Sequence, residues 1–125
     1  MRLQVGDTRG FTRTFSDADI LAFADLSGDR GRHHVARDPS GRLMAQGLLT
    51  ATLPTKIGGD LNYVAREMEF VFLAPVWSGD TVRCMTVVEE ARHGTGRTWY
   101  TLRIVCTNQD GVEVLRGRTV GFIAG

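Results

Sequence analysis

The chain has 125 residues, of which 42% are hydrophobic and 23% are charged, and its formal net charge is +1. This length predicts one domain over residues 1–125 with a real core, and the composition excludes an intrinsically disordered chain. A net charge this close to zero gives no overall field that would attract nucleic acid or an anionic membrane.

The first residues and the two cysteines predict where the protein resides. The N-terminus turns polar at once, so we expect no signal peptide, and no apolar run approaches the roughly 20 residues that a membrane span needs. Cys84 and Cys106 have no C-x-x-C spacing and fall in apolar, strand-like runs. We expect buried free thiols in a cytoplasmic protein, with a disulfide left open if the two strands are neighbours.

The first third of the chain predicts a short strand, a capped helix and a loop. Residues 9–15 read as a strand, and the helix that follows begins after Ser16 as N-cap and ends at Gly28. Acidic residues in the first turn of this helix favour its N-terminus. Residues 29–43 are polar and contain turn signals, so we expect a loop there.

A long, almost uncharged segment follows at 43–59. Its length favours a helix buried on most of its sides, with a kink or an early stop at Pro54. A helix without a polar face must be wrapped by another element, and a sheet is the element that the rest of the chain can supply.

The second half predicts that sheet. Apolar and polar residues alternate, and Asp110-Gly111 is a hairpin signal between the last two strands. The predicted strands are 63–75, 79–90, 97–108 and 112–124. The element order predicts an α+β fold in which an antiparallel sheet of about five strands wraps around one central buried helix.

This pattern resembles the MaoC-like dehydratase family, which includes the (R)-specific enoyl-CoA hydratases, over roughly residues 3–123. The stretches VGDTRGFTRTFSDADILAFADLSGD and FVFLAPVWSGDTV resemble the entry strand with its helix and a later strand-turn-strand run of that family. LMAQGLL resembles the start of its central helix. The resemblance implies a hot-dog fold, a thioester of coenzyme A or of an acyl carrier protein as substrate, and no cofactor.

The family's catalytic stretch is Gly-Asp-x-Asn-Pro-x-His, and it reads here as GDRGRHH, residues 28–34. Asp29 and His34 match this motif, whereas Gly31 and Arg32 replace its Asn-Pro pair. We expect His33 to point away from the site and to have a surface role.

The resemblance also implies roles for residues outside that stretch. Gln46 stands where the family has a histidine before Gly47, and the serine on its central helix falls on Thr55. Gln46 and Thr55 are candidate substrate-binding residues, with a structural hydrogen bond and helix packing as the respective alternatives. Arg30 and Arg32 are candidate partners for the phosphates of the carrier, although surface arginines are usually only solvated.

Hydration of an enoyl thioester needs a group that activates water and a donor that polarises the thioester carbonyl. Asp29 and His34 lie close together past a helix end, so a tight loop can direct both at one water. Gly47 lets a ligand approach the backbone N–H groups at the start of the central helix. Asp29, His34 and Gly47 are therefore the candidate catalytic residues.

These features predict a lyase that hydrates trans-2-enoyl thioesters or dehydrates (R)-3-hydroxyacyl thioesters. A hot-dog thioesterase is the first alternative, although the segment 39–59 has no acidic residue that could activate water from the helix. A non-catalytic module that binds an acyl thioester or another small ligand is the second.

Metal and nucleic-acid functions are disfavoured, and a homodimer is expected. Adjacent histidines cannot easily share one metal ion, and an arginine-rich loop without an aromatic platform does not predict a nucleic-acid site. One copy of the predicted sheet leaves open strand edges, which proteins tend to pair or cover. We therefore expect a homodimer with its active sites at or beside the interface.

Overall fold

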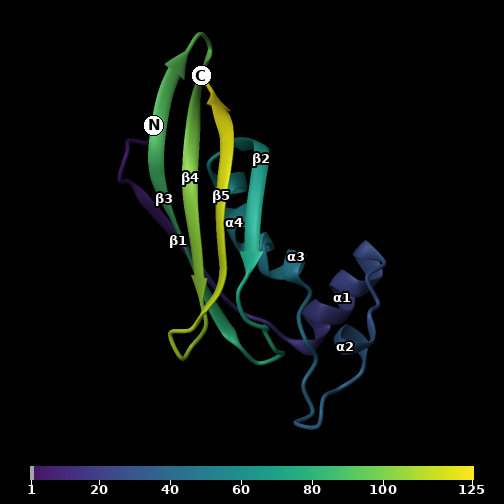
Figure 1. Ribbon diagram of the computed structural model, residues 1–125. Helices are drawn as coiled ribbons and strands as arrows, with labels where there is room; N and C mark the ends of the chain where they lie inside the picture. Colours follow the sequence, from purple (N-terminus) through teal and green to yellow (C-terminus); the bar gives the residue numbers. More distant parts are fainter. Residues whose placement is uncertain (1) are drawn as a thin grey trace.

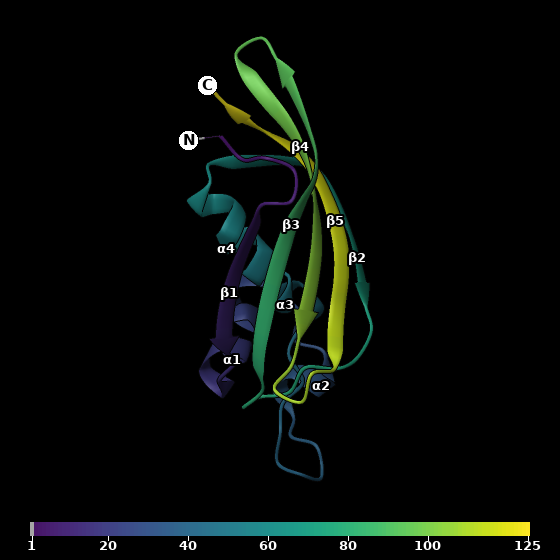
Figure 2. The same ribbon diagram turned by 90° about the vertical axis from the view of Figure 1, so that its left-hand side faces the viewer.

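The computed structural model describes residues 2–125, and it shows a strongly curved, five-stranded antiparallel sheet (Figures 1 and 2). The strand order across the sheet is β1-β3-β4-β5-β2, so β1 and β2 form its edges. The elements are β1 (Thr8–Thr14), α1 (Asp17–Ser27), α2 (Arg32–Val35), α3 (Gly47–Thr50), α4 (Thr52–Asp60), β2 (Tyr63–Phe72), β3 (Thr81–Gly94), β4 (Arg97–Thr107) and β5 (Glu113–Ala124). This arrangement confirms the predicted α+β fold class.

The core lies between the helices α3 and α4 and the face of the sheet that they cover (Figure 2). Leu53 and Ile57 of α4 are buried in one cluster with side chains of β3, β4 and β5, namely Val82, Ile104 and Leu115. Fully burying a side chain of this kind contributes about 1.5–3 kcal/mol, so the helix and the sheet depend on each other for stability.

Helix α1 follows its predicted caps. The Ser16 hydroxyl accepts a hydrogen bond from the Asp19 N–H, and the Asp19 carboxylate accepts one from the Ser16 N–H, which completes a capping box. Gly28 ends the helix with φ 80°, a left-handed conformation that favours glycine. This sharp end determines the direction in which the chain enters the loop at Asp29.

The central helix begins later than predicted. It starts at Gly47, because residues 43–46 are extended and Ala45 donates a backbone hydrogen bond to the carbonyl of Val76 at 2.8 Å. The helix breaks at Ala51 into α3 and α4, since Pro54 has no N–H to donate to the carbonyl four residues earlier. The predicted helix start at 43 was wrong, because an apolar run of this kind fits a buried strand as well as a helix.

The two cysteines face each other in the core. Cys84 of β3 and Cys106 of β4 are directly opposite, and both are buried free thiols, as expected. The hydrogen bond with Cys106, followed by burial, raises the pKa of the Cys84 thiol. The Cys84 side chain therefore acts as a neutral packing group.

Candidate active site

The candidate dyad lies where α1 gives way to the one-turn helix α2. Gly28 ends α1, so that Asp29 lies in the loop that follows. His34 lies in α2 and is buried, with only 5% of the residue exposed. The distance from His34 Nε2 to Asp29 Oδ2 is 3.4 Å. The other carboxylate oxygen of Asp29 accepts a hydrogen bond from the Gly31 N–H at 3.2 Å, which fixes the carboxylate. The predicted pair is therefore brought together.

The hydrogen bonds of His34 determine its tautomer. His34 Nδ1 lies 2.6 Å from the carbonyl oxygen of Met44, and a carbonyl oxygen only accepts, so Nδ1 carries a proton. In the neutral ring Nε2 is then an acceptor, and it faces the carboxylate of Asp29, which is also an acceptor. Two acceptors at 3.4 Å favour a molecule beside them that donates to both. Water has the two O–H groups that this geometry requires.

A cavity of about 550 Å³ connects the dyad to the start of α3. Its lining includes Asp29, His34, Gln46 and Gly47, so three predicted catalytic residues and one predicted binding residue share one space. The amide N–H of Gly47 is in the first turn of α3, where helix geometry supplies no intrahelical acceptor.

Gly47 is also in close contact with an aromatic ring. A Cβ atom at this position would lie 2.8 Å from Cε1 of Phe72, so only glycine allows the ring to lie against the backbone. Phe72 stands at the end of β2 and lines the same cavity. The ring excludes water from one side of the Gly47 backbone, which strengthens a hydrogen bond made there.

Gln46 is buried, and its amide connects two parts of the site. Its Nε2 donates to the carbonyl of Ile20 in α1 at 3.0 Å, while 1% of the residue is exposed. The hydrogen bond ties α1, which leads into Asp29, to the residue before Gly47. Gln46 Oε1 is the one buried side-chain polar atom without a partner among residues 2–125.

The other candidate binding residues lie outside this cavity. Thr55 borders a second cavity beside α4, and its hydroxyl donates to the carbonyl of Ala51 at 2.9 Å. Arg30 forms an ion pair of 2.6 Å with Asp25 on the surface, and Arg32 is exposed. None of Thr55, Arg30 and Arg32 therefore lines the cavity that holds the dyad.

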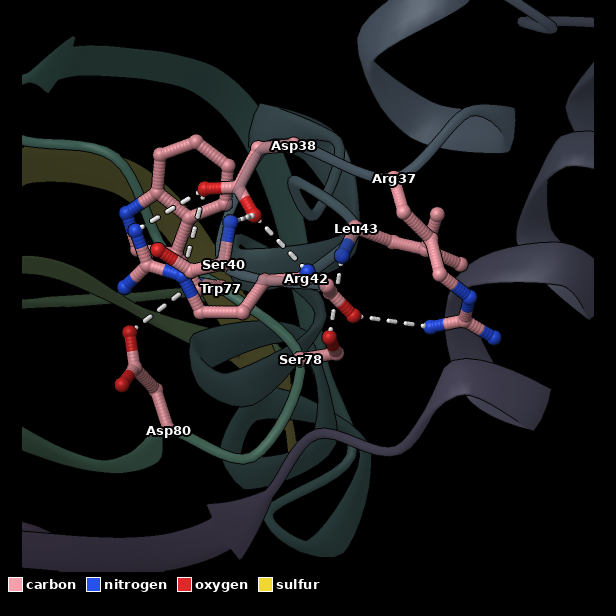
Figure 3. A network of polar contacts seen from close by, with 9 residues as sticks. Arg37, Asp38, Ser40, Arg42, Leu43, Trp77, Ser78 and Asp80 are labelled. Atoms are coloured by element: carbon pink, nitrogen blue, oxygen red, sulfur yellow. Dashed lines mark hydrogen bonds and ion pairs between the residues drawn. The ribbon is translucent and has the colours of Figure 1, made fainter.

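A polar network braces the loop between α2 and α3 (Figure 3). Asp38 accepts hydrogen bonds from the Ser40 and Arg42 backbones and from the Arg42 guanidinium, which lies 4.3 Å from the ring of Trp77. Arg37 reaches back to Asp17 of α1, and this hydrogen bond holds the pKa of the Asp17 carboxyl below its usual value. The network fixes the chain between His34 and Gln46.

The ring of His33 lies in a different place from the one that the sequence predicted. His33 is exposed, as a surface residue would be, but it lines the cavity, and its ring centroid lies 3.9 Å from that of His34 in an edge-to-face contact. The expectation that its ring points away from the site was wrong. Gly31 leaves room for this ring, since a Cβ there would lie 3.1 Å from His33 Cε1.

Two properties of the described part of the chain bear on other functions. Residues 2–125 contain no group of three or more His, Cys, Asp or Glu side chains that could hold a metal ion. No helix within the same range is long and apolar enough to cross a membrane.

Comparison with known proteins places the chain among its relatives. A scan against models of protein families gives no match. The chain is 32% identical over 124 residues to the 3-hydroxybutyryl-CoA dehydratase of Methylorubrum extorquens, a match that covers 90% of this chain and 75% of that protein.

Solved structures agree with that match. The (R)-hydratase from A. caviae involved in PHA biosynthesis superimposes with a TM-score of 0.85 at 26% identity, covering 95% of this chain and 96% of that one. The MaoC-like dehydratase from Rhodospirillum rubrum has the same fold, with a TM-score of 0.80 at 22% identity and coverage of 98% and 93%. The chain therefore belongs to the MaoC-like dehydratase family, the hot-dog proteins that include the (R)-specific enoyl-CoA hydratases.

Proposed function

We propose that the protein hydrates trans-2-enoyl thioesters, and dehydrates (R)-3-hydroxyacyl thioesters in the reverse direction, at the cavity that Asp29, His34 and Gly47 share. The observation that carries this proposal is the convergence of two acceptors, His34 Nε2 and Asp29 Oδ2, at 3.4 Å. Membership of a family of hydratases and dehydratases supports the reaction type.

The dyad activates the water that adds to the substrate. Water donates one hydrogen bond to His34 Nε2 and the other to Asp29, and loses a proton to this pair as its oxygen bonds to Cβ of the enoyl group. The pair then returns the proton to Cα, so that one molecule of water is added and the dyad regains its starting state. The hydrogen bond from His34 Nδ1 to Met44 stabilises the imidazolium that forms when Nε2 takes the proton.

Gly47 polarises the thioester. Negative charge grows on the carbonyl oxygen as water attacks Cβ, and a backbone N–H placed at that oxygen stabilises this charge more in the transition state than in the ground state. Gln46 affects both the dyad and Gly47, because its hydrogen bond to Ile20 maintains the spacing between α1, which leads into Asp29, and the start of α3.

The substrate is an acyl thioester of coenzyme A or of an acyl carrier protein. The relative from Methylorubrum extorquens is named for a coenzyme A thioester, which supports the former. Arg32 is the arginine of the catalytic loop for which no ion pair is found in residues 2–125, whereas Arg30, Arg37 and Arg42 each have a carboxylate partner. Arg32 is thus the best candidate for a phosphate of the carrier.

The test of this function is a direct assay. With crotonyl-CoA we expect loss of the enoyl absorbance without release of free thiol. Release of thiol at the same rate would instead identify a thioesterase, and tight binding of crotonyl-CoA without either change would identify a binding module. The cavity offers a thioesterase little support, because Asp29 is the only carboxylate in its lining among the described residues.

We also propose a homodimer that pairs the edge strand β2 of one subunit with β2 of the other. This strand forms one edge of the sheet and exposes large apolar side chains. Four of them are about half exposed: Val64, Met68, Val71 and Phe72. Unpaired strand edges and contiguous apolar surface both favour association. Antiparallel pairing about a two-fold axis would bring each Phe72 close to the partner.

The dimer is tested by a charge on that strand. We expect sedimentation equilibrium at micromolar concentration to give twice the monomer mass for the unmodified protein. Val71→Arg should shift the equilibrium towards monomer by at least ~10-fold, because the guanidinium loses water on burial. Val112→Arg, at an apolar position that is also about half exposed but lies between β4 and β5, is the control. Equal mass for both variants and the parent would contradict pairing through β2.

A further inference from the structure

The hydroxyl of Thr50 differs from those of the two threonines that follow it on α4. Thr52 donates to the carbonyl of Leu49 at 2.5 Å. Thr55 donates to the carbonyl of Ala51 at 2.9 Å, so both follow the usual pattern in which a helical hydroxyl bonds a carbonyl of the preceding turn. For the hydroxyl of Thr50 no partner is found in residues 2–125, although only 3% of the residue is exposed.

The carbonyl that a helical threonine usually bonds is already saturated at this position. Four residues before Thr50, the carbonyl oxygen of Gln46 accepts the N–H of Leu49 at 3.0 Å and the N–H of Thr50 itself at 3.2 Å. A carbonyl oxygen has two lone pairs, so both are engaged by these hydrogen bonds. Buried hydroxyls are as a rule hydrogen-bonded, and one that has no partner within the fold is available to a ligand.

The Thr50 side chain borders the dyad cavity on the Gly47 side. Both residues line that cavity. Side chains of an α-helix lean towards its N-terminus, so Thr50, three residues beyond Gly47, covers the turn that begins at Gly47. Within residues 2–125, the one fully enclosed side-chain polar atom without a partner is Gln46 Oε1, so the Thr50 hydroxyl is not enclosed and the space that it borders is the cavity.

The other polar side chains of the cavity cannot donate at Gly47. The polar members of the lining are Asp29, His33, His34, Gln46 and Thr50. Every other side chain that the described residues contribute to this lining is apolar. Asp29 and His34 Nε2 are acceptors, and the ring of His33 lies against that of His34. The Gln46 amide nitrogen is held at the carbonyl of Ile20. Thr50 is therefore the side chain that can donate beside Gly47.

We infer that the Thr50 hydroxyl donates to the thioester carbonyl oxygen, as a second donor beside the Gly47 N–H. That oxygen has two lone pairs, and one N–H engages only one of them. Negative charge on the oxygen grows as water attacks Cβ, so both hydrogen bonds strengthen in the transition state. Thr50 is accordingly a catalytic residue. This inference rests on the proposed function, since it adds a donor to the same site.

The experiment removes the hydroxyl and keeps the shape of the side chain. In Thr50→Val we expect kcat for crotonyl-CoA to fall by about 100-fold, the scale of one lost oxyanion donor, with KM within ~3-fold of the parent. Thr50→Ser keeps the hydroxyl and should retain kcat within ~5-fold. Thr52→Val is the matched control, because the Thr52 hydroxyl donates within the helix and Thr52 does not line the dyad cavity. Its kcat should stay within a factor of ~2 of the parent.

A second readout follows the hydrogen bond itself and does not require turnover. Infrared spectroscopy can measure the C=O stretch of bound, saturated butyryl-CoA that carries a heavy isotope at the carbonyl carbon. The stretch should lie at lower wavenumber in the unmodified protein and in Thr50→Ser than in Thr50→Val, because each donor weakens the C=O bond. Thr50→Ala repeats the test with a smaller side chain and should match Thr50→Val.

Three results would be decisive against a part of this account. Parent-like kcat and an unchanged C=O stretch in Thr50→Val would overturn the inference. Equal losses of kcat in Thr50→Val and Thr50→Ser would also overturn it, since they would assign packing alone to Thr50. Absence of hydration with every enoyl-CoA, together with the expected shift of the C=O stretch, would overturn the proposed function and leave the hydrogen bond from Thr50 to the thioester standing.

Discussion

Asp29→Asn and His34→Ala should each lower hydratase turnover by at least ~100-fold, the usual scale for a positioned acid/base group. In Asp29→Asn, an amide N–H can take the position of Oδ2, 3.4 Å from His34 Nε2, and donate directly to it, which removes the pair of acceptors that we assign to water. In His34→Ala, the proton acceptor is lost and the Met44 carbonyl loses its partner at 2.6 Å. Steady-state kinetics on crotonyl-CoA measures both effects.

The control for the dyad variants is a carboxylate outside the site. Asp60→Asn at the end of α4 removes a charge that is exposed and pairs with Lys56, so it should leave turnover within a factor of ~2 of the parent. Circular dichroism and urea unfolding should confirm that all three variants are folded. Parent-like turnover in both dyad variants would show that Asp29 and His34 have no part in the chemistry.

Gly121→Ala should destabilise the fold by about 3 kcal/mol or more, the upper end of what overpacking costs. The added methyl group would lie 2.2 Å from the carbonyl oxygen of Val64 and 2.7 Å from Tyr63 Cζ. Val64 and Gly121 belong to the hydrogen-bonded strands β2 and β5, so the carbonyl cannot move aside without opening the ladder between them. The free energy of unfolding in urea measures the loss.

A helical glycine gives the matched comparison for Gly121. Gly59 of α4 has no atom within 4 Å of the position that a Cβ would take. Gly59→Ala should therefore be neutral or stabilising by up to ~1 kcal/mol, because alanine favours the helix over glycine. Equal unfolding midpoints for Gly59→Ala and Gly121→Ala would contradict the close packing of β5 against β2.

The elements could be predicted well where local chemistry decides them. Ser16 and Gly28 mark the two ends of α1 because a capping hydroxyl and a left-handed residue are properties of single side chains. The start of the central helix could not be predicted in this way. Residues 43–46 are extended because the 76–78 segment offers them backbone hydrogen-bond partners, and a partner this distant in the chain leaves no local signal in the sequence.

The candidate site was predictable in part for the same reason. Asp29 and His34 lie within one loop, so their spacing in the sequence is close to their spacing in space. Thr55 is nine residues beyond Gln46 and borders the second cavity. Which cavity Thr55 borders depends on the helix break at Ala51 and on the path of β2 beside the helix, and neither can be read from local sequence. The second cavity joins residues from four strands and a helix, which no sequence period could reveal.

The two edges of the sheet differ in a way that bears on solubility. β1 is the shortest strand, with seven residues, and it carries Arg9 and Arg13, whereas β2 has ten residues and exposes the apolar side chains of Val64, Met68 and Val71. Short, charged edges resist the addition of further strands. When two copies join through β2, both outer edges of the joint sheet are β1 strands. In the proposed dimer, growth by edge pairing would therefore stop at two subunits, and the longer edge with its exposed apolar side chains, which could seed fibres, would be hidden.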